Sequence, residues 1–375
     1  MKRKVLFILL SIALSNSLVS AQGGGDPSKL FGNTKMMITG NAEASLVADT
    51  GYVNFTDVSF KPIFLWHLSD RLFIEAETEI ASGGEGVELV LEYANMCYFI
   101  NDFLTIHAGR FLPKFGAYRG RMGESFINKF AEDPVGFGDG GIGPMIESGI
   151  GLQGGAPLGN SKINYDFWVS NGPNLIDGTE DPENAGQFEY EAYADNNKNK
   201  AIGGRVGLLP FSNSSLEVGV SFENASKSGA AYSDLENTGV MMWAADLEYY
   251  KAISPIKSTV RLIGEYKSQK VDNAYYPVPD DTTFYTFDNN SSAAYGSVSI
   301  RPTASKNKLL RNFELCYRYS EFDRPKEAPW GGDKVLTQSA VALDYWLRWN
   351  CLVKLTWNKN SDSDNLYVAQ FVYGF

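Results

Sequence analysis

The chain has little cysteine and little histidine, and both shortages narrow its possible function. Its 375 residues include three cysteines, Cys97, Cys316 and Cys351, and two histidines, His67 and His107. These positions do not form a zinc pattern, and three widely spaced cysteines indicate isolated thiols in strands. No Ser or Asp beside either histidine repeats a known catalytic arrangement. We therefore expect no metal site, no cofactor and no enzymatic activity.

Long apolar runs are missing after the first residues. Residues 1–21 have a basic start, an apolar run and small residues before Gln22, which is the pattern of a secretory signal peptide cleaved after Ala21. Beyond it, no stretch reaches the roughly 18 consecutive apolar residues of a transmembrane helix. An exported chain of this kind is a secreted protein, a periplasmic protein or an outer-membrane barrel.

Basic residues are fewer than acidic ones. The chain holds 33 Lys and Arg against 44 Asp and Glu, and removing the three basic residues of the signal segment leaves a net charge of −14. An acidic chain argues against nucleic acid as a partner, because phosphate backbones are bound by clustered Lys and Arg. Aromatic residues at 13% and 37 glycines favour many strands joined by turns.

Alternation of apolar and polar residues repeats along the rest of the chain. In residues 161–171, Ile163, Tyr165, Phe167 and Val169 share one face, and polar residues fill most of the other. Such a strand belongs either to the surface of a soluble sheet or to the wall of a membrane barrel. We count sixteen segments of this kind: 36–48, 55–67, 71–81, 87–100, 103–113, 146–156, 161–171, 200–209, 215–225, 239–251, 257–269, 291–302, 312–322, 337–348, 351–359 and 365–375.

The connections between these segments distinguish a soluble sheet from a membrane barrel. Even-numbered strands end in short turns, whereas odd-numbered strands from the fifth to the thirteenth end in long polar loops. This asymmetry is typical of outer-membrane barrels, and a soluble sandwich has no reason to keep it. We predict an all-β transmembrane antiparallel barrel of about 16 strands over residues 36–375, after a signal peptide at 1–21 and a periplasmic segment at 22–35. The long loops are 117–145, 172–199, 226–238, 270–290 and 323–336.

The last strand gives independent support. Tyr367, Phe371, Tyr373 and Phe375 lie on one parity, where aromatic residues would meet the membrane interface. The pattern resembles the terminal signal of outer-membrane barrels, so we expect outer-membrane lipid and the barrel assembly machinery as partners. An ordinary final strand of a sandwich is the alternative. Pro62 lies inside the second strand, where we expect a bulge or a shorter strand.

The loop after the fifth strand carries many apolar side chains. It runs for about thirty residues without a regular period, and a loop of that length is usually functional or disordered. Disorder fits poorly, because its apolar groups need burial. We expect the loop to fold inside a larger structure, with its charged residues in water at the constriction of a pore. The apolar set is Phe115, Tyr118, Met122, Phe126, Ile127, Phe130, Val135 and Phe137, and the charged set is Arg119, Arg121, Glu124, Lys129, Glu132 and Asp133.

Two short motifs in the loops do not support ligand binding. Gly138–Gly143 matches G-x-G-x-x-G, but Pro144 and an alternating strand follow it, so the strand–loop–helix context of a dinucleotide site is absent. Asp195 opens a segment that starts like a calcium loop but lacks Gly at the sixth position and Glu at the twelfth.

One segment has a specific family resemblance. Residues 109–116 read Gly-Arg-Phe-Leu-Pro-Lys-Phe-Gly and are followed by Ser125–Phe130. This resembles the phosphate-selective porin O and P family of Gram-negative outer membranes, in which a strand ends G-[RK]-F-x-x-P-F-G and enters an inward-folded loop. Lys114 is an insertion relative to that pattern. The resemblance implies a sixteen-stranded trimeric porin, a channel narrowed by its third outer loop, and anion transport.

We therefore expect an outer-membrane porin of a Gram-negative bacterium, a passive aqueous channel for small hydrophilic solutes. The alternative is a structural or adhesive barrel that presents the aromatic-rich loops 188–193 and 275–287 to a partner. Charge favours a weakly cation-preferring or unselective channel over an anion-selective one, because acidic residues dominate the early strands and basic residues gather late. The expected pore wall is Glu75, Glu77, Glu79, Arg261, Lys267, Arg318 and Arg348.

Overall fold

The structure is a computed structural model of the chain, and it describes residues 35–48, 51, 53–83, 86–278 and 283–375. The predicted signal peptide and nearly all of the predicted periplasmic segment lie outside the described residues. No helix among the described residues is long and apolar enough to cross a membrane.

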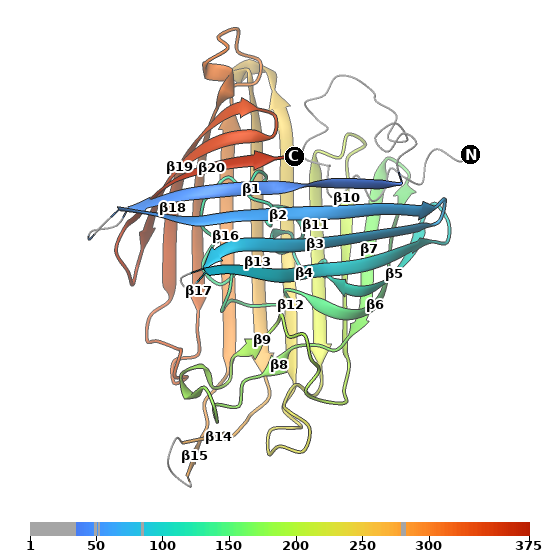
Figure 1. The fold of residues 1–375 in the computed structure, drawn as a ribbon, viewed down its shortest axis with the longest axis vertical. Coiled ribbons are helices and arrows are strands. Elements are labelled where there is room, and N and C mark those ends of the chain that lie inside the picture. The colour runs from blue at the N-terminus through green and yellow to red at the C-terminus, as the bar shows by residue number, and fades with distance from the viewer. Residues whose placement is uncertain (1–34, 49–50, 52, 84–85, 279–282) are drawn as a thin grey trace.

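Within the described residues, sixteen antiparallel strands close into a single barrel, which confirms the predicted fold class (Figure 1). Each strand pairs with the next barrel strand along the chain, and β20 pairs with β1. The strands are β1(Met36–Ala48), β2(Val53–Ser69), β3(Leu72–Gly83), β4(Gly86–Phe99), β5(Leu104–Phe111), β6(Glu147–Leu158), β7(Ser161–Ser170), β10(Ala201–Leu209), β11(Leu216–Ala225), β12(Val240–Ile253), β13(Ser258–Val271), β16(Asn290–Arg301), β17(Phe313–Asp323), β18(Leu336–Arg348), β19(Cys351–Asn360) and β20(Leu366–Gly374).

Long connections follow β5, β7, β11, β13 and β17, as the parity of the loops predicted. They hold the helix α3(Tyr118–Met122), the 3₁₀ turn η2(Pro182–Asn184) and two small ladders. The ladders pair β8(Asn174–Leu175) with β9(Phe188–Glu189) and β14(Tyr276–Pro277) with β15(Phe284–Tyr285), and both lie at the lower end of the barrel in Figure 1. The other rim has shorter turns, which include η3(Ser254–Ile256) and η4(Leu310–Asn312).

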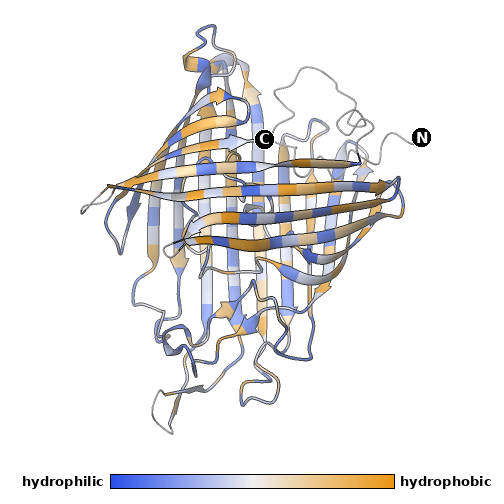
Figure 2. Ribbon diagram, viewed as in Figure 1, coloured by the Kyte–Doolittle hydropathy of each residue, from blue (hydrophilic) through white to orange (hydrophobic). Residues whose placement is uncertain are grey.

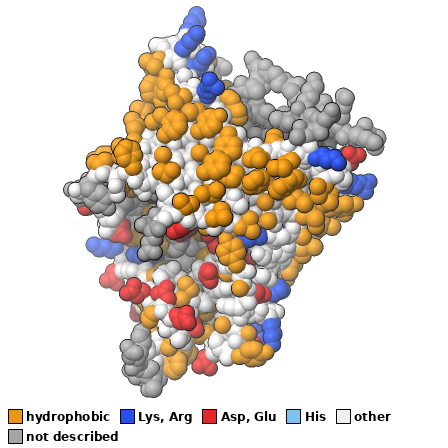
Figure 3. Space-filling view, in the orientation of Figure 1, with side chains coloured by type: hydrophobic (Ala, Val, Ile, Leu, Met, Phe, Trp, Pro, Cys, Tyr) orange, Lys and Arg blue, Asp and Glu red, His pale blue; other side chains and the backbone are white. Residues whose placement is uncertain are grey.

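The two faces of the barrel wall differ in polarity. On β11, Val218, Val220 and Phe222 are exposed, whereas Ser221 and Glu223 are buried. The other strands repeat this pattern, so the hydropathy colours alternate along the ribbons in Figure 2 and apolar side chains cover much of the surface in Figure 3. A polar inside and an apolar outside reverse the arrangement of a soluble protein and match a barrel surrounded by lipid.

The expected bulge or shortening at Pro62 is wrong. Strand β2 runs for 17 residues through this position, and Pro62 stays in register opposite Gly40 of β1. The pairing with β3 passes from Phe60 to Ile63 without a shift, but Lys61 and Pro62 have no assigned partner there. The missing N–H of Pro62 is therefore accommodated by a gap in one ladder, and the strand keeps its length.

Phe375 helps to close the barrel at the seam between the first and last strands. Its backbone exchanges hydrogen bonds with Gly40, at 2.9 Å for the N–H of Phe375 and 3.2 Å for its carbonyl oxygen. The same carbonyl accepts a bond from Thr39 Oγ1 at 2.6 Å, and the ring stacks on Phe60 at 5.1 Å.

We therefore expect deletion of Phe375 to lower the fraction of assembled barrel, because it removes these backbone bonds and one ring contact. The measurement is the heat-modifiable band on a gel after refolding. Phe375→Tyr, which keeps the backbone and the ring, serves as the control and should assemble normally. Unchanged assembly of the deletion would show that the terminal strand signal was misread.

Candidate pore constriction

The segment between β5 and β6, residues 112–146, is anchored to the barrel first through a carboxylate of β13. Glu265 accepts the N–H groups of Ala117 and Tyr118, each at 2.8 Å, and Ser221 Oγ accepts the N–H of Gly116 at 3.0 Å. Gly116 has φ +69°, and a Cβ there would lie 1.8 Å from Glu265 Oε1. Only glycine fits this position, which explains the last residue of the Gly109–Gly116 motif.

Arg121 of α3 forms the second anchor. Its guanidinium pairs with Glu217 of β11, and its Nη1 lies 3.1 Å from Glu248 Oε2 of β12. Burial opposes the charge of Arg121, but the two carboxylates raise its pKa above the ordinary value. We expected this residue to face water; its side chain is 21% exposed at the edge of a cavity and is ion-paired as well.

The charges around this anchor alternate along the wall. Arg205 Nη1 lies 3.1 Å from Glu217 and its Nη2 lies 2.7 Å from Asp246, while Arg261 Nη2 lies 2.8 Å from Glu248. Each basic group therefore has an acidic neighbour, so this part of the wall carries little net charge. Sequence reasoning assigned residues to the wall by parity, but it could not pair them across strands.

Basic residues of β13, β17 and β19 bind backbone carbonyls of the same segment. Arg318 Nη2 donates to Glu132 O at 2.9 Å, Lys267 Nζ to Ile142 O at 3.1 Å and Lys354 Nζ to Phe130 O at 3.4 Å. All three basic side chains are nearly fully buried, with residue exposures of 0–1%. They hold the segment in place, and they present little charge to water.

Other predicted constriction residues also make specific contacts. Arg119 Nη2 lies 2.6 Å from Glu191 Oε1, and Lys129 Nζ lies 4.5 Å from the ring centre of Trp346. Asp133 Oδ1 accepts the hydroxyl of Tyr118 at 2.6 Å.

Glu124 and Glu132 complete the predicted charged set of the segment. Glu124 accepts a hydrogen bond from Asn41 Nδ2. Burial raises the pKa of Glu124 to about 7, with Lys61 opposing the shift and Glu43 adding to it. The backbone carbonyl of Glu132 accepts the hydrogen bond from Arg318 described above.

The predicted pore-wall residues of β3 share its inner face. Arg348, which was predicted for the same wall, does not lie with them. Glu75 accepts a hydrogen bond from Asn95 at 3.3 Å, Glu77 is 6% exposed and Glu79 pairs with Lys61 at 2.9 Å. Arg348 lies at the exposed end of β18, after a register shift between Trp346 and Arg348. The shift ends the strict alternation from which its position in the wall was predicted.

Most apolar residues of the segment pack into one large cluster, whereas Phe130 and Phe126 join two smaller ones, so the expected burial of this set is largely confirmed. Phe115 is 1% exposed and Phe137 0%, and Phe137 meets Tyr118 and Tyr295 in edge-to-face contacts at 5.8 and 4.8 Å. Phe126, Ile127 and Val135 are partly buried.

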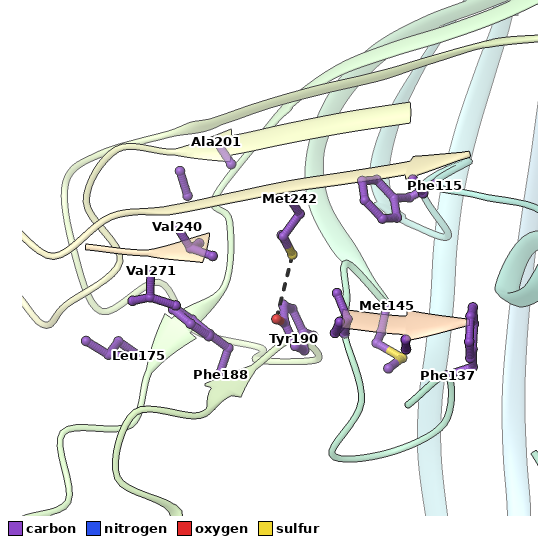
Figure 4. Close-up of a cluster of buried hydrophobic side chains, with 14 of the residues drawn as sticks. Phe115, Phe137, Met145, Leu175, Phe188, Tyr190, Ala201, Val240, Met242 and Val271 are labelled. Carbon is purple, nitrogen blue, oxygen red and sulfur yellow. Dashed lines mark hydrogen bonds between the residues drawn. The ribbon is translucent and has the colours of Figure 1, made fainter. Parts of the chain in front are cut away.

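A second loop, residues 171–200, joins the same cluster. Figure 4 shows Phe188 and Tyr190 near Met242 of β12, and the hydroxyl of Tyr190 lies 3.6 Å from Met242 Sδ. The same hydroxyl is hydrogen-bonded to Gln269. Phe188 and Tyr190 were candidates for contact with a partner, but each is 8% exposed and packs inside the protein. Their aromatic character was visible in the sequence, and their burial was not.

Two large cavities lie against different parts of the segment. One, of about 1090 Å³, is lined by its residues 131–136 and 138–141 and by residues of β1–β3 and the long loops. The other, of about 860 Å³, is lined by Lys114, Gly116, Gly120 and Arg121 and by residues near the short turns. A space of only about 20 Å³ borders Tyr118 and Met122. The apolar middle of the segment is therefore tightly packed, with open volume on both of its sides.

Comparison with known proteins was made by sequence and by structure. No family model matches the chain, and no curated protein matches it in sequence. Solved structures do: OmpF of Salmonella typhi has a TM-score of 0.56 at 13% identity, covering 91% of this chain and 97% of that chain. The outer membrane channel DcaP of Acinetobacter baumannii has a TM-score of 0.53 at 11% identity, covering 91% and 97%. An anion-selective porin from Comamonas acidovorans has a TM-score of 0.52 at 13% identity, covering 91% and 99%.

The chain has the fold of a porin barrel. At 11–13% identity these likenesses establish the fold alone. The phosphate-selective family suggested by the motif stays a prediction, because no family model matches.

Proposed function

We propose that the protein is a porin of a Gram-negative outer membrane, a passive, water-filled channel for small hydrophilic solutes. The observation that carries the proposal is the pair of cavities on the two sides of residues 112–146, within a closed barrel whose inner face is polar. A sixteen-stranded barrel is too wide to be filled by its wall side chains alone, so its lumen admits water unless loops plug it.

In this proposal residues 112–146 narrow the channel. The contacts with Glu265, Glu217, Arg318 and Lys354 support an inward position, because these side chains belong to the polar, buried face of the wall. Flow would pass beside the charged edge of the segment, where Arg119, Glu132 and Asp133 are only partly buried or exposed. The adhesive alternative receives less support, because Phe188, Tyr190, Tyr276 and Phe287 are buried and only Tyr193, Tyr275 and Phe284 of the described aromatic residues in these loops are strongly exposed.

We also propose a homotrimer assembled by the barrel assembly machinery. OmpT of Vibrio cholerae, whose structure resembles this chain with a TM-score of 0.50, is described in a trimer form. The exposed aromatic residues of β20, Tyr367, Phe371 and Tyr373, support recognition of the last strand as a terminal signal.

The charge pattern favours weak cation preference over phosphate selection. An anion-selective path needs Arg and Lys side chains that are open to the passing ion. Here Arg205 and Arg261 are paired with carboxylates, and Lys267 and Arg318 are engaged by the loop. Carboxylates line the larger cavity, so potassium should enter more readily than chloride.

The zero-current potential across a potassium chloride gradient tests this charge preference. We expect the sign of the zero-current potential to indicate a modest preference for potassium over chloride. Millimolar phosphate should not block the current. The same protein in a gradient of a neutral-buffered tetraethylammonium salt controls for solute size. A clear chloride preference, or phosphate block at low concentration, would instead support the phosphate-selective family.

A further inference from the structure

The larger cavity, which we call the acidic chamber, has a strong charge imbalance. Among the described residues its lining includes six carboxylates and one basic side chain, Arg324. The smaller cavity is lined by five basic and four acidic residues, so the imbalance belongs to one end of the barrel. Acidic side chains also gather toward the loop end in Figure 3. The carboxylates of the chamber are Glu43, Glu79, Glu132, Asp133, Asp139 and Glu183.

The spacing of these carboxylates does not suit a metal ion. Among the described residues, no three His, Cys, Asp or Glu side chains come close enough to hold one. A calcium ion needs about six to eight oxygen ligands at roughly 2.3–2.6 Å. Carboxylates spread over a chamber of about 1090 Å³ suit instead a flexible ligand whose positive charges are themselves spaced apart.

A buried amide gives a second, independent indication of a ligand with N–H groups. Gln370 of β20 lines the chamber and is 5% exposed. Its Nε2 donates to Glu43 Oε2 at 3.1 Å, but its Oε1 has no hydrogen-bond partner among the described residues. A donor that arrives from the chamber, either water or an N–H group of a ligand, would satisfy this buried carbonyl oxygen. An ammonium group is such a donor.

Aromatic residues also line the acidic chamber. Trp330 and Phe322 line the same chamber. The backbone carbonyl of Trp330 accepts a hydrogen bond from Arg324 Nη1 at 2.9 Å. This bond turns the one basic lining group among the described residues toward the backbone. Aromatic faces attract ammonium ions and also contact methylene groups. One carboxylate, Glu79, is already paired with Lys61 at 2.9 Å, which reduces its own attraction for an ammonium group.

We propose that the acidic chamber binds linear oligoamines, molecules of the spermidine class in which ammonium groups are separated by methylene chains. This inference rests on the proposed function for its biological meaning, since it names a solute class for the channel. The binding itself depends only on the folded chamber. Carboxylates attract the ammonium groups, Gln370 Oε1 accepts one N–H, and Trp330 and Phe322 contact the methylene groups.

Calorimetric titration of the refolded full chain in detergent with spermidine tests the proposal. We expect saturable binding that magnesium chloride at equal concentration does not abolish. The variant D139N/E183Q removes two exposed lining carboxylates and should weaken spermidine binding about tenfold, since each exposed ion pair contributes up to about 1 kcal/mol. The matched control E189Q/E327Q removes two exposed carboxylates that do not line the chamber and should bind as the parent does.

Each outcome decides a separate point. Equal affinity of D139N/E183Q and the parent, or displacement of spermidine by equimolar magnesium, would overturn the proposal in favour of general counterion attraction. Absence of binding to a correctly folded parent would overturn it as well. Spermidine binding by a protein that carries no current in bilayers would contradict the porin function and leave the oligoamine site standing.

Discussion

Replacing residues 119–139 by a short Gly-Ser linker is expected to raise single-channel conductance severalfold. These residues include much of the tightly packed material between the two cavities, and the space beside Tyr118 and Met122 is only about 20 Å³. Point substitutions would not open this path, because the five fully buried side chains of the apolar set stabilise the segment by roughly 1.5–3 kcal/mol each before the entropy of ordering is counted. The measurement is the step size in planar bilayers.

The control for this deletion removes residues 232–234 from another long loop. They line neither large cavity, and Tyr232 is 83% exposed, so conductance should stay at the parent value. Both variants must first show the heat-modifiable band of a folded barrel. A folded 119–139 replacement with the conductance of the parent would place the segment outside the conduction path.

Arg121→Ala is expected to loosen the segment and to increase current noise. The substitution leaves Glu217 and Glu248 with one basic partner fewer each, while Arg205 and Arg261 remain. Removing one member of a fully buried ion pair costs about 3–5 kcal/mol, and we expect about 2 kcal/mol here because the three side chains keep some contact with water. The measurements are the open-channel noise and the midpoint of thermal unfolding.

Arg119→Ala is the matched control, because it removes the same charge from the same helix. Its partner Glu191 has a side chain that is 40% exposed, so the ion pair contributes about 0–1 kcal/mol. This control should show the open-channel noise of the parent and nearly the same midpoint of thermal unfolding. Equal noise and equal unfolding midpoints in the two variants would contradict the role of Arg121 as an anchor.

The strands could be predicted from the sequence because a barrel wall forces strict alternation. The segment predicted at 215–225 is β11(Leu216–Ala225), and the one predicted at 365–375 is β20(Leu366–Gly374). Loop parity identified the rim with the long connections for the same reason: antiparallel strands return to the same rim at every second connection.

The contacts of the loop could not be predicted in the same way. The alternation along a strand predicts which face of the sheet a residue occupies. It does not predict which loop atom that residue contacts. Glu265 binds Ala117 from a position 148 residues away, and Arg121 meets two carboxylates of neighbouring strands. Both contacts depend on the path that the chain takes after β5. The burial of Tyr190 depends likewise on the packing of one loop against another.

Single-channel recording of the purified, refolded chain in planar bilayers tests the central claim most directly. The account predicts steady current steps of uniform size that grow in proportion to salt concentration and stay open at low voltage. A protein that is folded by the heat-modifiability criterion, inserts into the bilayer and gives no such steps would contradict the claim that the barrel encloses a water-filled channel.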